Sequence, residues 1–76
     1  MTVRTQTRRT GYYELTDEDI ITLVNLGGVL TDVDHDTEAD NTKVITRSWP
    51  SIESAQAWLD YTRTIDDMRT GEILQD

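Results

Sequence analysis

The residues best suited to chemistry lie in one acidic run around the only histidine of the chain, His35. Alternating carboxylates of this kind open a calcium-binding EF-hand loop. The match then fails, because Thr37 stands where that loop needs glycine and Lys43 stands where it needs glutamate. We therefore expect a polar turn with a weak candidate cation site and no specifically bound metal. The residues of that candidate site are Asp32, Asp34 and Asp36.

A lone histidine beside carboxylates could act as a base or as half of a metal site. The chain has no cysteine, so a structural zinc site is not expected, and His35 is interpreted as an exposed residue at the end of a strand. No serine, histidine and acid have the spacing of a catalytic triad, and no glycine-rich phosphate loop is present. The sequence therefore predicts no catalytic residue and no cofactor.

Two tryptophans, nine residues apart, are the other candidates for a site. We favour packing in the core or in an interface, where tryptophan is enriched. The alternative is a pocket between sheet and helix that holds a flat ligand. The residues of that candidate ligand pocket are Trp49, Trp58, Tyr61 and His35.

Two capped helices must position these residues. Thr16 is a good N-cap, acids fill the next turn, and Gly27 and Gly28 end the first helix, which we place at 17–26. Ser51 caps the second helix, whose wide apolar arc continues to Met68, and Gly71 is its expected C-cap.

Strands are expected at 2–10, 29–35 and 43–49, and a short last strand is an option at 72–75. In the second strand, alternation places Val29, Thr31 and Val33 on one face. A polar turn joins the second and third strands into a hairpin, and a turn centred near Glu38 and Ala39 sets Asp34 opposite Lys43.

This order predicts a single α+β domain over residues 1–76 with the ferredoxin-like split β-α-β-β-α(-β) plan. Its antiparallel sheet carries both helices on one face. Two right-handed crossovers place the first and third strands side by side at the centre.

One unit, a strand that runs into a serine-capped helix, resembles a known family. It reads Trp49-Pro50-Ser51-Ile52-Glu53-Ser54-Ala55, followed by Trp58. Over about residues 43–62 the chain resembles the dimeric α+β barrel proteins, including those grouped with antibiotic-biosynthesis monooxygenases. The resemblance implies a ferredoxin-like fold and a dimer, and places no active-site residue.

Size and charge narrow the choice of partners. With 76 residues, 36% hydrophobic content and no cysteine, the core is thin, so we expect a homodimer. The net charge of −8 argues against nucleic-acid binding and favours a basic protein partner. No apolar run is long enough for a membrane span, and we expect a cytoplasmic protein.

The leading hypothesis is a small acidic protein-interaction or accessory module without catalytic activity, of a kind that also suits a virus or mobile element. The alternative is a dimeric α+β barrel enzyme or small-ligand binder with an aromatic pocket.

Overall fold

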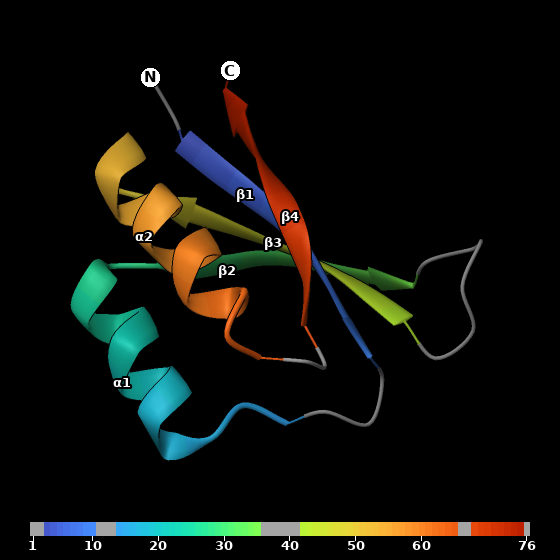
Figure 1. The fold of residues 1–76 in the computed structure, drawn as a ribbon. Coiled ribbons are helices and arrows are strands. Elements are labelled where there is room, and N and C mark those ends of the chain that lie inside the picture. Colours follow the sequence, from blue (N-terminus) through green and yellow to red (C-terminus); the bar gives the residue numbers. More distant parts are fainter. Residues whose placement is uncertain (1–2, 11–13, 36–41, 66–67, 76) are drawn as a thin grey trace.

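A computed structural model describes residues 3–10, 14–35, 42–65 and 68–75 of the chain (Figure 1). The strands and helices follow one another in the order β-α-β-β-α-β, and the structure confirms the predicted α+β class. The elements are β1 (Val3–Thr10), α1 (Asp17–Leu26), β2 (Val29–His35), β3 (Thr42–Trp49), α2 (Ile52–Thr62) and β4 (Met68–Gln75).

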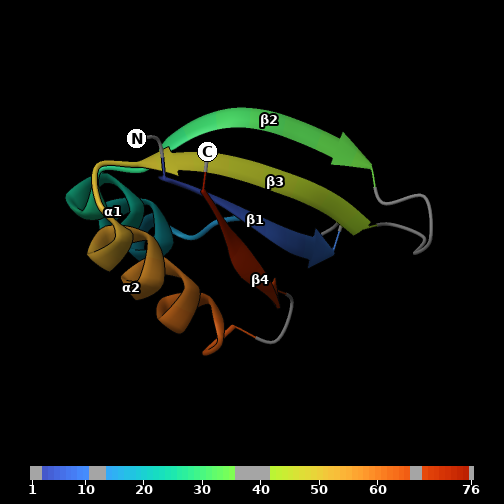
Figure 2. The ribbon, with the colours of Figure 1, turned by 90° about the horizontal axis from the view of Figure 1, so that it is seen from above.

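The four strands form one antiparallel sheet in the order β2-β3-β1-β4. β1 and β3 are its central strands, as predicted, and β2 and β4 are its edges. Both helices lie on the same side of the sheet (Figure 2). The sheet therefore has one face that carries the helices and one open face.

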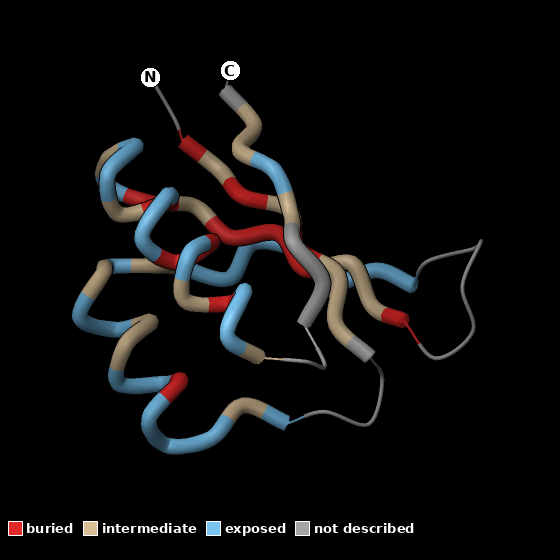
Figure 3. The backbone as a smooth tube through the Cα atoms, in the orientation of Figure 1, coloured by how far each residue is buried: buried red, intermediate tan, exposed pale blue. Residues whose placement is uncertain are grey.

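Alternation along β1 decides which residues enter the core. Val3, Thr5 and Thr7 are buried, and they pair with Trp49, Arg47 and Ile45 of β3, respectively. The central hydrophobic cluster joins Val3 and Trp49 to two residues of α2, Ala55 and Trp58. Most of the buried residues accordingly lie on β1, β3 and α2 (Figure 3).

α1 has the predicted ends. The Thr16 hydroxyl accepts a hydrogen bond from the Asp19 backbone N–H, and the Asp19 carboxylate accepts one from the Thr16 N–H, at 3.2 and 2.9 Å. This reciprocal capping box satisfies two backbone donors at the helix start. Gly27 ends the helix in the left-handed conformation, with φ 79°, which glycine adopts without steric cost.

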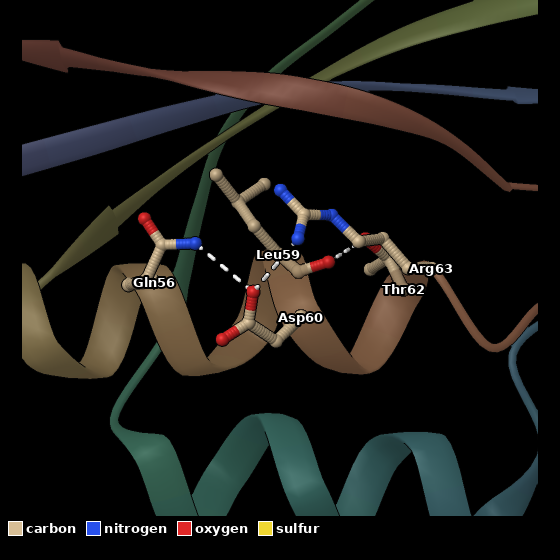
Figure 4. Close-up of polar contacts among 5 residues, drawn as sticks. All are labelled: Gln56, Leu59, Asp60, Thr62 and Arg63. Carbon is tan, nitrogen blue, oxygen red and sulfur yellow. Dashed lines mark hydrogen bonds and ion pairs between the residues drawn. The ribbon is translucent and has the colours of Figure 1, made fainter.

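α2 begins at the predicted cap, since Ser51 accepts a hydrogen bond from the Ser54 N–H. The prediction that the helix continues to Met68 is wrong. The helix ends at Thr62, whose hydroxyl donates to the Leu59 carbonyl at 2.8 Å (Figure 4). The Thr64 hydroxyl donates to the Tyr61 carbonyl at 2.7 Å. Threonine hydroxyls that bond to nearby carbonyls offer the backbone an alternative to the helix.

The expected C-cap, Gly71, instead lies within β4. The pairing of β1 with β4 shifts between Gln6 and Arg8, which marks a bulge. A Cβ at Gly71 would collide with the backbone carbonyl of Gln6. Glycine is therefore needed here for close approach of two strands, and the optional strand at 72–75 is the second half of a longer one.

The predicted register of the β2–β3 hairpin is correct at its start and wrong at its end. A register with Asp34 opposite Lys43 would also set Leu30 opposite Arg47, and this second pair is present. A bulge follows Leu30, so Lys43 pairs with His35 instead of Asp34. The bulged residue is Thr31, whose hydroxyl donates to the Thr46 carbonyl at 3.1 Å.

Because of this bulge, the prediction that Val29, Thr31 and Val33 share one face of β2 is wrong. Val29 pairs with Ser48 on the open face of the sheet, whereas Val33 pairs with Ile45 on the helix-bearing face. The two valines expected on one face are therefore on opposite faces, because one extra residue inverts the alternation that follows it.

Candidate functional site

Three of the four predicted pocket residues lie together. The ring centroids of Trp49 and Trp58 are 5.8 Å apart, and those of Trp58 and Tyr61 are 5.6 Å apart and stacked. His35 does not join them, because it lies exposed at the last position of β2. The described residues enclose no pocket, so the ligand-pocket hypothesis stays a prediction without a cavity to support it.

The aromatic rings are fixed by core contacts. Trp58 is fully buried, and Trp49 is 5% exposed with its indole N–H donating to the Thr5 hydroxyl at 2.8 Å. Trp49 also fills the space next to Gly28, where a Cβ would come within 2.6 Å of the indole ring. These contacts agree with the favoured interpretation of the tryptophans as packing residues.

A short hydrogen bond ties the two helices together. The Tyr61 hydroxyl on α2 donates to Oδ1 of Asp19 on α1 at 2.5 Å. Asp19 is 3% exposed and is the only described residue of α1 that is buried. The bond to the carboxylate raises the pKa of Tyr61, as do burial and the charge of Asp19, because each disfavours a second negative charge there.

The sequence-based prediction missed Arg47, which lies among the core residues. It is 4% exposed, and its guanidinium carbon lies 5.3 Å from the centroid of the Trp58 ring. Burial, and then the charge of Arg9, lower the pKa of Arg47 well below its ordinary value, to about 10. Alternation from Ile45 to Trp49 could have placed it inward, since all three odd-numbered positions share the helix-bearing face.

The candidate cation site is only partly within the described residues, since Asp36 lies outside them. Asp32 and Asp34 pair with Thr46 and Val44 on the open face of the sheet, and both acids are exposed. Oδ1 of Asp34 accepts a hydrogen bond from the His35 N–H at 2.8 Å. In the described part of the chain, no three potential ligands are grouped to hold a metal ion.

Exposed apolar side chains gather on α1 and β2. Six of the seven large hydrophobic residues that are exposed in the described ranges belong to these two elements; the exception is Ile52 of α2. We call five of them the α1–β2 surface, leaving out Val29 because it lies on the open face. Its members, with their exposed fractions, are Ile20 (45%), Ile21 (59%), Val24 (68%), Leu30 (55%) and Val33 (47%).

The chain segment that carries this surface is acidic. Residues 10–42 contain nine acids and no lysine or arginine. Five of the acids, Glu14, Asp17, Glu18, Asp32 and Asp34, are exposed. The segment that carries the α1–β2 surface is thus acidic, while Arg47 and Lys43 of the neighbouring β3 pair with Leu30 and His35. The absence of basic residues over 10–42 was a signal visible in the sequence.

Comparisons with known proteins add no identity: no protein-family model matches the chain, and no curated protein and no solved structure is similar to it. No helix in the described ranges has the length and apolar character needed to cross a membrane. The functional interpretation therefore depends on the surface and the interior of this chain alone.

Proposed function

We propose that this protein is a non-catalytic interaction module whose α1–β2 surface binds a basic segment of another protein. One observation carries the proposal: β2 is an edge strand in which every residue is exposed, and the helix that precedes it exposes three large apolar side chains, Ile20, Ile21 and Val24. Apolar patches with a polar surround on small proteins commonly mark sites of protein association.

The edge position of β2 suggests how a partner binds. An edge strand presents a row of backbone N–H and C=O groups with which another strand can pair. Leu30 and Val33 lie on the helix-bearing face of β2 and are about half exposed. An extended segment added beside β2 would pair with its backbone and cover these two side chains, which is the strand-addition mode of peptide recognition.

Charge selects the partner. Two copies of the α1–β2 surface would bring the exposed acids of α1 and β2 against one another, which costs free energy. A segment that alternates apolar with lysine or arginine residues would cover the apolar positions and neutralise Asp32 and Asp34. The occupant we propose is therefore a basic strand-forming segment rather than a second copy.

A peptide that alternates valine and lysine tests the proposal by isothermal titration calorimetry at moderate salt. The variant Leu30→Asn should weaken binding at least tenfold, because it removes an apolar contact at the centre of the surface. Ile52→Asn is the matched control, since Ile52 is 44% exposed but lies on α2, and it should bind like the wild type.

Two further peptides separate strand pairing from general attraction of charge. A peptide of equal charge with N-methylated backbone amides should bind at least tenfold more weakly, because it cannot complete the ladder of hydrogen bonds. A valine–glutamate peptide should not bind. Equal binding of the N-methylated peptide, or equal loss in the Leu30 and Ile52 variants, contradicts the proposal.

The ferredoxin-like plan and a homodimer are part of the same proposal. The order β2-β3-β1-β4, with both helices on one face, supports the split β-α-β plan. The thin core supports a dimer, and the acidic α1–β2 surface argues for a twofold axis elsewhere, with β4 as the other edge of the sheet. Light scattering tests the dimer, and a monomer at micromolar concentration contradicts it.

A further inference from the structure

Several buried hydrogen-bond donors on the helix-bearing side of the sheet have no partner. Four buried side-chain atoms on this side of the sheet have no hydrogen-bond partner, and each of them can donate. Buried polar atoms in native proteins are nearly always paired, so four unpaired donors on one side need an acceptor. The atoms are Thr7 Oγ1, Arg9 Nε, Arg47 Nε and Trp58 Nε1.

Strand register places three of these residues close together. Thr5 pairs with Arg47, and Thr7 and Arg9 follow it at alternate positions of β1, on the same face. Arg9 pairs with Lys43, which adds another positive charge at that end of the face. Two arginines and a lysine therefore share the helix-bearing face of a chain whose net charge is −8, with the Thr7–Ile45 pair between Arg47 and the Arg9–Lys43 pair.

Arg47 lacks a negative partner within the described residues. Its side chain lies over the Trp58 ring, and no hydrogen bond or ion pair to a described carboxylate accompanies that contact. A buried guanidinium without a counter-charge is costly, because burial removes its hydration. Arg63, the C-cap of α2, shows the ordinary arrangement, since it is exposed and lies 3.4 Å from the Asp60 carboxylate.

We propose that Arg47 and Arg9 form a binding site for a small oxyanion, a phosphate or a carboxylate, on the helix-bearing side of the sheet. A guanidinium donates two parallel hydrogen bonds to such a group. Thr7, fully buried between the two arginine positions, supplies a hydroxyl donor. Arg9 is only half-buried, so the anion reaches the site from its end of β1. Arg47 pairs with Leu30, so this site borders the α1–β2 surface on the same face of the sheet.

Thermal unfolding followed by circular dichroism tests the site, with inorganic phosphate and acetate in separate arms and chloride at matched ionic strength. At ten times its Kd, the bound anion should raise the Tm of the wild type by about 5–10 °C relative to chloride. If only phosphate acts, the site selects tetrahedral anions; if both act, it takes carboxylates as well. No response to either arm overturns the proposal.

Variants separate a bound anion from a general effect of salt. Arg47→Met should abolish the response, and Arg47→Lys, which keeps the charge but loses the fork, should weaken anion binding at least tenfold. Arg63→Gln is the matched control and should respond like the wild type. Equal stabilisation of wild type and Arg47→Met overturns the proposal, because phosphate also stabilises proteins by exclusion from their surface.

A second measurement locates the anion. In ¹⁵N spectra of the arginine side chains, phosphate should shift the Nε–Hε resonances of Arg47 and Arg9 and leave that of Arg63 unchanged. The chain's own Asp66 and Asp67, which lie outside the described residues, are the competing acceptors. A phosphate response that is absent from the wild type and arises only in Asp66→Asn/Asp67→Asn overturns the proposal.

Discussion

The two helices of this protein start alike and end in different roles. Each begins with a hydroxyl cap, Thr16 for α1 and Ser51 for α2, and each packs on the same side of the sheet. α2 buries four residues in the core, whereas the only residue that α1 buries is a carboxylate that serves the cap and the helix–helix contact. Leu23 and Leu26 of α1 are only partly buried against the core. α1 is thus held by polar contacts and two leucines, while Ile20, Ile21 and Val24 stay exposed.

The strands differ in the same way. β3 lies between two neighbours and buries five of its eight residues, whereas β2 has one neighbour and every residue exposed. Buried apolar area is the main source of folding free energy, so stability resides in β1, β3 and α2. The unit made of α1 and β2 contributes little to the core and presents the apolar surface. Predictions that remove residues from either side test this division.

The largest effect is expected at the centre of the stable part. Trp58→Ala should lower the free energy of unfolding by about 3–5 kcal/mol, because Trp58 is fully buried against Trp49, Tyr61 and Arg47. That is a large share of the roughly 4–11 kcal/mol available to a domain of this size. Chemical denaturation measures the change, and Ile52→Ala on the exposed side of the same helix should cost less than about 1 kcal/mol.

The hydrogen bond between Tyr61 of α2 and Asp19 of α1 should show the next largest effect on stability. Tyr61→Phe should destabilise the fold less than Trp58→Ala does, because it removes the donor to the Asp19 carboxylate but keeps the aromatic ring. Thr64→Ala, which removes an exposed hydroxyl at the end of the same segment, serves as the control.

The Tyr61 contact also predicts a pH dependence. The pKa of Tyr61 is raised in the folded state, so its hydrogen bond stabilises the fold fully below the unfolded pKa of about 10 and is lost as pH rises through the folded pKa. The difference in unfolding free energy between wild type and Tyr61→Phe should therefore be constant from pH 7 to 9 and shrink in more alkaline solution. A constant difference at all pH values contradicts the assigned bond.

Removal of the first helix cap should have a smaller effect. Thr16→Ala should cost about 1 kcal/mol, since it removes one half of the capping box with Asp19. Thr16→Ser should restore most of the loss, because serine supplies the same acceptor. A loss much above 2 kcal/mol would mean that α1 contributes more to the core than its exposed residues indicate.

The smallest effect is expected on the α1–β2 surface. Val24→Gln should change the unfolding free energy by less than about 0.5 kcal/mol, because Val24 is 68% exposed. The same variant should weaken binding of the valine–lysine peptide. Together with Trp58→Ala, it separates a surface kept for binding from a core kept for stability.

Local chemistry made the helix starts and the end of α1 predictable. Thr16, Ser51 and Gly27 act through bonds to residues close in sequence, so their roles can be inferred without a partner strand. The bulges at Thr31 and Gly71 could not be inferred, because each depends on the distant strand with which it pairs. Burial of Arg47 was missed for another reason: a charged residue within a strand is ordinarily assigned to solvent, although alternation with Ile45 and Trp49 already pointed it toward the helices.

Hydrogen–deuterium exchange along β2, with and without the valine–lysine peptide, tests most directly the claim that this edge is a docking site. In the free protein, the amides of residues 29–35 that do not bond to β3 should exchange rapidly, while those of β1 and β3 are protected. The peptide should slow exchange along β2 by at least tenfold and leave β4 unchanged. Protection of β4 instead, or of neither edge, would contradict the account.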